Sequence, residues 1–306
     1  MNLISCFFPP IYHFINHITR SSQEETKAVR LKCRQYLHPR FGFLATELRA
    51  EIDAELATEM GICLEDLGLD RDDTETEGKK IIDDGVTARF HKTSEGCFKE
   101  DPVESTPEDS GTAELLNSVL GQQFSQYRRA GLDDGENIDT QTADISGWHP
   151  CDIDEKFLAE NYISFAFNNA LDPLVPWSVD LGNAWNRWEG NRKEKPHVCF
   201  TMMHNVPPPA TDGLLRTEAL TIMGVMLTRL RGAGGKGHAV FPVQAISIFD
   251  RYQARIIQSY MSEAGLDFVK SPLYDFSTPE ERENVKIFLR YMASEPVGDT
   301  RVFKFG

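Results

Sequence analysis

The chain has 306 residues, a formal net charge of −15 and a sequence pI of about 5.0. A chain of this length can bury one sizeable core, and 41% hydrophobic with 26% charged residues is typical of a globular protein. The negative charge argues against broad affinity for nucleic acids or anionic membranes, although a local basic groove is compatible with it. We therefore expect no strong nucleic-acid signal from the chain as a whole.

The first 20 residues are apolar and aromatic, and Pro9-Pro10 breaks the apolar run early. They fit neither a secretory signal nor a transit peptide, and no transmembrane segment is expected. Two interpretations stay open, a partly buried or poorly ordered terminus and a peripheral membrane contact. Six scattered cysteines without a C-x-x-C pair predict reduced thiols in an intracellular protein, cytoplasmic or nuclear. These cysteines are Cys6, Cys33, Cys63, Cys97, Cys151 and Cys199.

Residues 1–69 are predicted to form an N-terminal helical segment. Between residues 28 and 69, apolar side chains recur at four-residue steps with Glu and Arg between them, which is typical of amphipathic helices. The residues concerned are Leu44, Leu48, Ile52 and Leu56.

Residues 70–147 are predicted to be an acidic, largely disordered linker. Acidic pairs alternate there with small polar residues, and large apolar residues become rare: the pairs are Asp72-Asp73, Asp83-Asp84, Glu108-Asp109 and Asp133-Asp134. Such a segment buries too little surface to offset its ordering entropy. Within it, residues 113–129 show a short helical pattern of Leu116, Leu120 and Phe124. We interpret this pattern as a segment that could dock on a protein partner.

Residues 148–306 are predicted to form one α+β globular domain. All four tryptophans lie between residues 148 and 188, which favours an aromatic core over a ligand site. A strand is expected over Val198–Met202. The prolines 207–209 would then link it rigidly to a helix from about Leu214 to Arg231. Asp212 is the expected N-cap of that helix, and Gly232 its left-handed C-terminal residue.

Three strands are expected after this helix, over Ala239–Phe249, Gln253–Tyr260 and Leu266–Phe276. Short polar breaks separate them, as in an antiparallel meander. A capping box at residues 278–281 then predicts a second helix, which Pro296 and Gly298 end. A last strand is expected over Val302–Phe305. The predicted core is therefore a helix, a three-strand meander, a helix and a strand.

Several short motifs carry no specific chemistry. The Gly-rich segment 231–237 lacks the spacing and the Ser or Thr of a phosphate loop, and it follows a helix where a phosphate loop follows a strand. We interpret it as a connection. His197, Cys199 and His204 are close in sequence, but no second pair completes a tetrahedral metal set.

The order of elements in the C-terminal third resembles the core of the PD-(D/E)xK nuclease-like superfamily. That resemblance implies metal-assisted phosphodiester hydrolysis, with acids that hold Mg²⁺ and a lysine that orients water. The corresponding residues here are Glu218 on the first helix, Asp250 before the second strand, and Asp267 with Lys270 on the third. The sequence departs from the family because two residues separate Asp267 from Lys270. On a regular strand these side chains point to opposite faces.

A structural interpretation of the same residues stands beside the catalytic one. In it Glu218 pairs with an arginine, and Asp250 and Asp267 are turn or solvated residues. The C-terminal third is also similar to uncharacterised proteins of filamentous fungi, through Val240–Val243, Arg255–Gln258 and Lys270–Phe276. That similarity implies no activity.

The sequence favours a non-catalytic binding or regulatory module that needs no cofactor and meets a protein partner through the acidic insert. The alternative is a nuclease-like fold, active or decayed, with Mg²⁺. In that alternative alone Glu218, Asp250, Asp267 and Lys270 are catalytic residues.

Overall fold

The structure is a computed structural model that describes residues 9–67, 89–91, 113–126, 148–150, 179–189, 193–204, 206–232, 237–250, 252–301 and 303. The helices are α1 (Pro9–Thr46), α2 (Ala54–Glu59), α3 (Ala113–Gln126), α7 (Arg216–Arg231) and α8 (Glu281–Met292). The strands are β1 (Glu51–Ile52), β2 (Ile62–Asp66), β3 (Arg89–His91), β4 (Trp148–Pro150), β5 (Val179–Glu189), β6 (Lys193–His204), β7 (Leu214–Leu215), β8 (Val243–Phe249), β9 (Gln253–Ser262), β10 (Gly265–Lys270), β11 (Tyr274–Asp275) and β12 (Glu295–Val297). The fold class is α+β, as predicted.

One mixed sheet organises these elements, with strand order β2-β10-β9-β8-β6-β5-β4 and β11 paired to β9. The neighbours β2 and β10 are parallel, as are β6 and β8, and the other pairs are antiparallel. Two small sheets, β1 with β7 and β3 with β12, lie apart from it. The chain therefore brings residues about 200 positions apart into adjacent strands at the β2–β10 edge.

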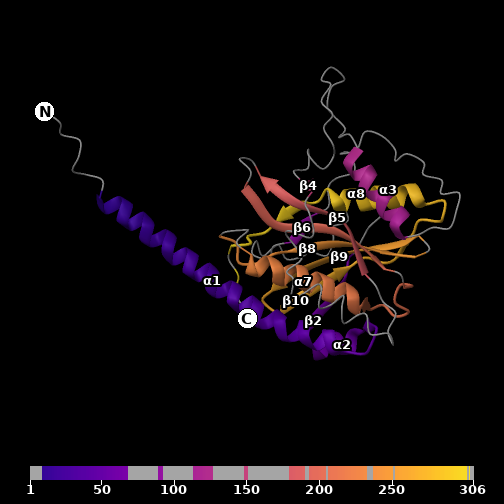
Figure 1. Cartoon of the computed structure of the whole chain (residues 1–306), viewed down its shortest axis with the longest axis horizontal. Coiled ribbons are helices and arrows are strands. Elements are labelled where there is room, and N and C mark those ends of the chain that lie inside the picture. The colour runs from indigo at the N-terminus through magenta and orange to yellow at the C-terminus, as the bar shows by residue number, and fades with distance from the viewer. Residues whose placement is uncertain are drawn as a thin grey trace, which may run out of the picture.

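Helices cover both faces of this sheet (Figure 1). On one face α1 packs beside α7, and on the other α3 packs beside α8. Side chains of β8 alternate between the two cores, with Val243 and Ala245 toward α7 and Ile246 and Ile248 toward α8. This alternation follows from the period of two along a strand. Because a core covers each face of the sheet, every residue of β8 is buried.

Helix α7 occupies the predicted position and is buried on nearly every side, as expected of a central helix. Two details of its ends differ from the prediction. Its N-cap residue is Leu215, whose backbone N–H donates to the Glu218 carboxylate at 2.7 Å, so Asp212 does not cap the helix. At the other end Gly232 is extended, with φ −63° and ψ 158°, and is not left-handed.

The predicted meander is confirmed as β8, β9 and β10, which follow one another in antiparallel order. The first strand begins later than expected, at Val243, whereas β9 runs two residues beyond the predicted end, to Ser262. Ala239 and Val240 lie before β8, because their backbone N–H groups bond to the carbonyl of Thr300. The third predicted strand divides into β10 and β11 around Pro272, which has no N–H to offer the sheet.

Helix α8 buries the predicted apolar face of Val285, Phe288, Leu289 and Met292. Its N-cap is Glu280 rather than Thr278, whose hydroxyl donates to the carbonyl of Asp275 instead. After α8, β12 pairs with β3 and not with the main sheet. The strand expected over 302–305 lies outside the described residues except for residue 303.

The N-terminal segment is helical over α1 and α2 but not throughout. Leu48 is 78% exposed and off the apolar stripe, and Ile62–Asp66 is the strand β2. The four-residue spacing of apolar residues therefore predicted too much helix. Strand β2 is stabilised by pairing with β10, which is distant in the sequence and leaves no trace in the local periodicity. Within the part of the chain that the structure describes, no helix is long and apolar enough to cross a membrane.

Most of the acidic insert lies outside the described residues, and the predicted disorder with it. The helix expected there is confirmed as α3, and its apolar side chains Leu116, Leu120 and Phe124 are buried in the core beside α8. The segment interpreted as a docking site for a partner thus packs on the protein's own fold. Trp148 is also buried, and its indole N–H donates to the Ser294 carbonyl at 2.9 Å. The side chains of the other tryptophans are outside the described part.

Candidate functional site

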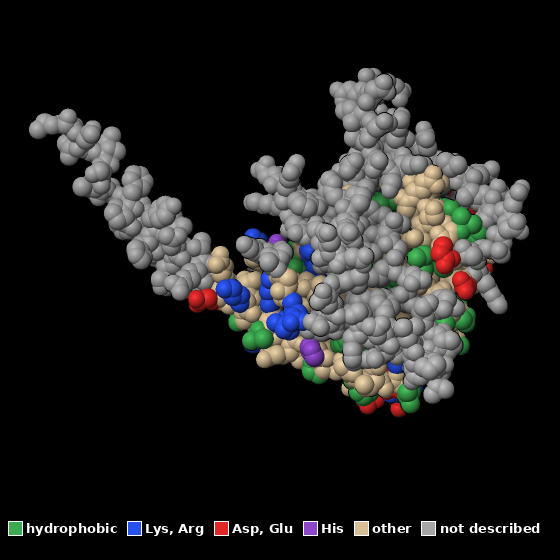
Figure 2. All heavy atoms as spheres, in the orientation of Figure 1, with side chains coloured by type: hydrophobic (Ala, Val, Ile, Leu, Met, Phe, Trp, Pro, Cys, Tyr) green, Lys and Arg blue, Asp and Glu red, His purple; other side chains and the backbone are tan. Residues whose placement is uncertain are grey.

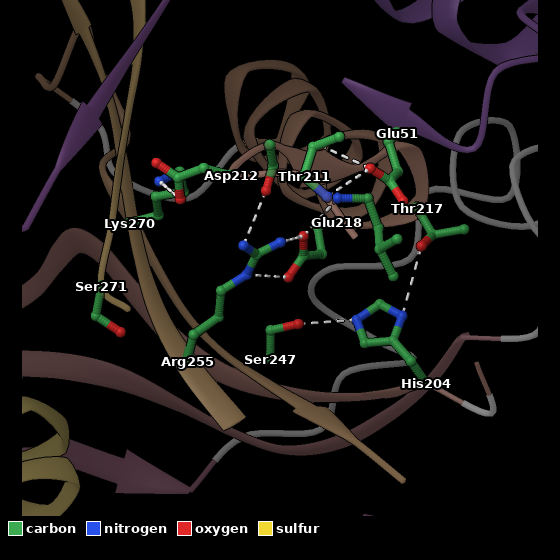
Figure 3. Close-up of polar contacts among 12 residues, drawn as sticks. Glu51, His204, Thr211, Asp212, Thr217, Glu218, Ser247, Arg255, Lys270 and Ser271 are labelled. Carbon is green, nitrogen blue, oxygen red and sulfur yellow. Dashed lines mark hydrogen bonds and ion pairs between the residues drawn. The ribbon is translucent and has the colours of Figure 1, made fainter. Parts of the chain in front are cut away.

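A buried ion pair lies where α7 begins over the sheet. Arg255 on β9 donates from Nε to Glu218 Oε1 at 2.9 Å and from Nη2 to Glu218 Oε2 (Figure 3). The same guanidinium donates to the Gly213 carbonyl at 2.9 Å. The side chains of Arg255 and Glu218 are 3% and 0% exposed. One arginine therefore joins the sheet, the start of α7 and the segment that leads into it.

The residues of this pair reach one another because of strand periodicity. Arg255 precedes Ile257 by two positions on β9, and Ile257 packs in the core under α7. Arg255 must therefore point to the same face. Burial by itself raises the pKa of the Glu218 carboxyl, but the charge and hydrogen bonds of Arg255 outweigh burial and hold that pKa below its ordinary value. Glu218 is thus ionised and fully paired.

His204, at the end of β6, extends the network. Its Nε2 lies 2.9 Å from the Ser247 hydroxyl, its Nδ1 lies 3.4 Å from the Thr217 hydroxyl, and its ring stacks on Phe249 (Figure 3). Burial lowers the pKa of His204 to about 4, against the opposing influence of the Glu218 charge. The imidazole is therefore neutral at pH 7. A serine and a histidine in contact resemble a nucleophile and its base, but Ser247 has no exposed surface.

A second ionic group lies where β10 ends. Lys270 Nζ is 2.7 Å from carboxylate oxygens of both Asp66 and Asp212. The lysine side chain is 4% exposed, whereas the two aspartates are 76% and 85% exposed. Burial alone lowers the pKa of Lys270, but the two carboxylates outweigh it and raise that pKa. This group ties β2 and the segment before α7 to β10.

The structure places the four sequence-predicted site residues in different surroundings. Glu218 and Lys270 lie on the α7 side of the sheet, since Lys270 follows the core residues Leu266 and Phe268 at two-residue steps. Asp267 lies between Leu266 and Phe268 on β10, so its side chain points to the opposite face, as its spacing from Lys270 predicts. It is 8% exposed and so is not a solvated residue. Asp250 is exposed in the turn between β8 and β9.

Five members of this network were not predicted from the sequence: Arg255, His204, Ser247, Asp66 and Asp212. Arg255 alone carried a signal, because a charged residue in an otherwise apolar strand needs a buried partner. Asp66 and Asp212 meet Lys270 only through the tertiary fold. Among the described residues, no group of three or more His, Cys, Asp or Glu side chains is arranged to hold a metal ion.

Charge-assisted hydrogen bonds in this arrangement hold the start of α7 on the sheet. Each charged side chain is paired with an oppositely charged side chain of the same network. Comparisons of the chain with protein-family models, with curated proteins and with solved structures find no match, so the candidate site stands on its own geometry.

Proposed function

We propose that this protein is a non-catalytic binding or regulatory module. The observation that supports this is the state of Glu218, the acid that would have to hold Mg²⁺ in a nuclease-like site. Both of its oxygens accept hydrogen bonds from Arg255, and one also accepts from the backbone of Leu215. A carboxylate offers about four lone-pair sites, and these hydrogen bonds occupy most of them. The Glu218 side chain has no exposed surface.

A protein partner would meet the module through the acidic insert, residues 70–147. That insert carries 19 acidic and eight basic residues, a net charge of −11 out of −15 for the whole chain. Such charge suits a basic partner surface by complementarity. Because the apolar face of α3 is buried on its own domain, the contacting residues would come from the insert on either side of α3. An intracellular location accords with Cys33, Cys63 and Cys199, which are free thiols.

One observation favours the alternative of a nuclease-like fold, active or decayed. Glu218 and Lys270 share a face of the sheet near the start of α7, as that alternative requires. The geometry of Asp267 opposes it, since this side chain points to the other face. Carboxylates that bind one metal ion must all lie within coordination distance of that ion.

A cleavage assay tests the proposal. Purified protein is incubated with Mg²⁺ or Mn²⁺ and with single- and double-stranded DNA and RNA, and the substrates are expected to stay intact. The matched control is Asp250→Asn, which removes the exposed acid without altering the core. Metal-dependent cleavage that disappears in Asp250→Asn would overturn the proposal in favour of the nuclease. Cleavage that survives this change would indicate a contaminant or another site.

A further inference from the structure

Strand β2 forms one edge of the main sheet, where it pairs with β10 alone among the described strands (Figure 1). The Leu67 N–H donates to the Lys270 carbonyl at 2.6 Å, so the backbone of Leu67 and, two residues earlier, of Glu65 faces β10. The N–H and C=O groups of the alternate residues Leu64 and Asp66 therefore point away from the sheet. Within the described part of the chain, no group forms a hydrogen bond to them.

The open part of β2 is its C-terminal half. At the start of the strand Ile62 is buried, and the Tyr36 hydroxyl of α1 donates to the Gly61 carbonyl just before it. From Leu64 onward the side chains are half-buried or exposed. We call residues 64–67 the open edge. Unpaired N–H and C=O groups at such an edge form a template on which another extended chain can pair.

Each face of the open edge presents one leucine and one acid. Leu64 packs against the core under α7, and Asp66 lies on the same face two residues later. Leu67 packs against the core beside α8, and Glu65 shares that face. Both leucines are half-buried and both acids are exposed. A strand added here would complete the burial of the leucines and place its own side chains opposite the acids.

The open edge is negatively charged. Lys270 lies between Asp66 and Asp212, so two carboxylates surround one ammonium. Glu65 forms no salt bridge with any residue that the structure describes. Helix α2, which contacts β2, adds further acids, and Figure 2 shows Asp and Glu side chains at the lower margin of the body, where α2 lies.

We propose that the open edge binds an extended, basic segment of a protein partner, which joins the main sheet as a strand beside β2. Main-chain hydrogen bonds to Leu64 and Asp66 hold the segment, and its alternate side chains give selectivity. The inference rests on the proposed function, because it gives the basic partner of the acidic insert a conformation and a binding place. Residues 68 and 69 alone separate the open edge from that insert, so one partner would contact both.

A second copy of this chain fits the open edge less well than a basic partner. Two copies would bring together the acids of both edges and two net charges of −15. Like charges across a strand pair are destabilising, and charged side chains on an edge strand commonly prevent such pairing. The same acids attract the lysine and arginine side chains of a basic segment. They therefore select between the two occupants.

A fluorescein-labelled peptide, Thr-Val-Lys-Lys-Val-Thr, tests the inference with the full-length protein. In either strand direction its valines can face the two leucines of the open edge and its lysines the two acids. Fluorescence anisotropy should show saturable binding. The same peptide with both lysine backbone nitrogens methylated keeps its charge but loses N–H donors. It should bind roughly tenfold more weakly, because main-chain hydrogen bonds to β2 are lost.

Amide hydrogen exchange, followed residue by residue by NMR, locates the contact. In the free protein the N–H groups of Leu64 and Asp66 should exchange rapidly, whereas that of Leu67, which bonds to β10, should exchange slowly. The peptide should slow the exchange of Leu64 and Asp66, because their N–H groups then donate to the added strand.

Glu65→Lys reverses one charge of the open edge and should weaken binding of the unmethylated peptide about fivefold, because a favourable cross-strand pair becomes a repulsive one. The matched control is Glu25→Lys, which makes the same change at an exposed position of α1. It should leave the affinity unchanged. Equal losses in the two variants would reduce the effect to bulk charge and overturn the inference, as would the absence of saturable binding.

The exchange data separate the remaining outcomes. Equal binding of both peptides without protection of Leu64 and Asp66 would place the basic partner on the acidic insert alone, so the inference would be wrong and the proposed function would stand. Protection of these two residues in the free protein that disappears on dilution would assign the open edge to a second copy and overturn the inference. Peptide-dependent protection together with metal-dependent nucleic-acid cleavage would contradict the proposed non-catalytic function but support this binding site.

Discussion

Arg255 and Glu218 form an ion pair from which water is excluded, and it joins β9 to the first turn of α7. The hydrogen bonds of Arg255 to Gly213 and of Leu215 to Glu218 make the pair the fixing point for the start of the helix. A buried pair of this kind contributes little net stability compared with apolar packing, but the loss of one partner leaves a buried charge unpaired. Its role is to set where α7 begins.

Glu218→Gln should lower the free energy of unfolding by about 3–5 kcal/mol, because Arg255 would keep its charge without a carboxylate. Urea unfolding followed by circular dichroism measures this loss. Asp212→Asn is the control, since Asp212 is 85% exposed and Lys270 keeps Asp66. It should cost less than about 1 kcal/mol. If Glu218→Gln does not fold, Glu218→Met with Arg255→Met should recover folding. Equal costs for the two single variants would contradict this account.

Stability should fall as the pH is lowered from about 6.5 to 4. The unfolded chain protonates His204 near its ordinary pKa of 6.5, whereas burial in the native state holds that pKa at about 4. The unfolded state therefore binds more protons in this window, and the free energy of unfolding declines by about 3 kcal/mol, from 1.36 kcal/mol per pH unit. Glu218 adds to this decline below its ordinary pKa of 4.5, because its native pKa is lower.

His204→Gln is the control for the pH dependence, because glutamine can still bond to Ser247 but does not titrate. Its unfolding free energy, from urea titrations at several pH values, should fall less steeply between pH 6.5 and about 4.5 than that of the unmodified protein, and the lowered pKa of the half-buried His238 accounts for part of the decline that is left. Parallel profiles for the variant and the unmodified protein would assign the pH dependence to another group.

Gly213→Ala should destabilise the protein by about 1–3 kcal/mol through overpacking. A Cβ atom at residue 213 would lie 2.3 Å from the Ile52 carbonyl oxygen, and backbone would have to move. Gly42→Ala is the matched control, since a Cβ at this exposed position of α1 meets nothing within 4 Å. That change should raise stability by about 1 kcal/mol through helix propensity. Thermal unfolding compares the two, and a stabilised Gly213→Ala would mean that β1 and β7 do not approach so closely.

Phe124→Ala should cost about 3–5 kcal/mol, because Phe124 is fully buried between α3 and the core that contains α8. Leu115→Ala on the same helix is the control, since Leu115 is 38% exposed and should change stability by less than about 1 kcal/mol. Urea titration of both variants measures the difference. Similar, small effects would show that α3 is not an integral part of the domain.

The sequence by itself determined the elements whose signals are local. Helix α8 follows from the periodicity of Val285, Phe288, Leu289 and Met292, and the β8–β9–β10 meander from apolar runs with short polar turns. The opposed directions of Asp267 and Lys270 also follow from strand geometry alone. For the same reason the helical pattern of Leu116, Leu120 and Phe124 predicted α3 correctly.

Only the tertiary structure decided what those elements meet. Ile62–Asp66 became a strand because β10 offers it an edge about 200 residues away, and no local period encodes that partner. Asp212 was a good N-cap by sequence, yet it pairs with Lys270, and Glu218 closes the first turn of α7 instead. In such cases hydrogen bonds between residues far apart in the sequence form in place of the local ones. A buried charge without a partner is costly, and the tertiary fold determines which partner lies beside it.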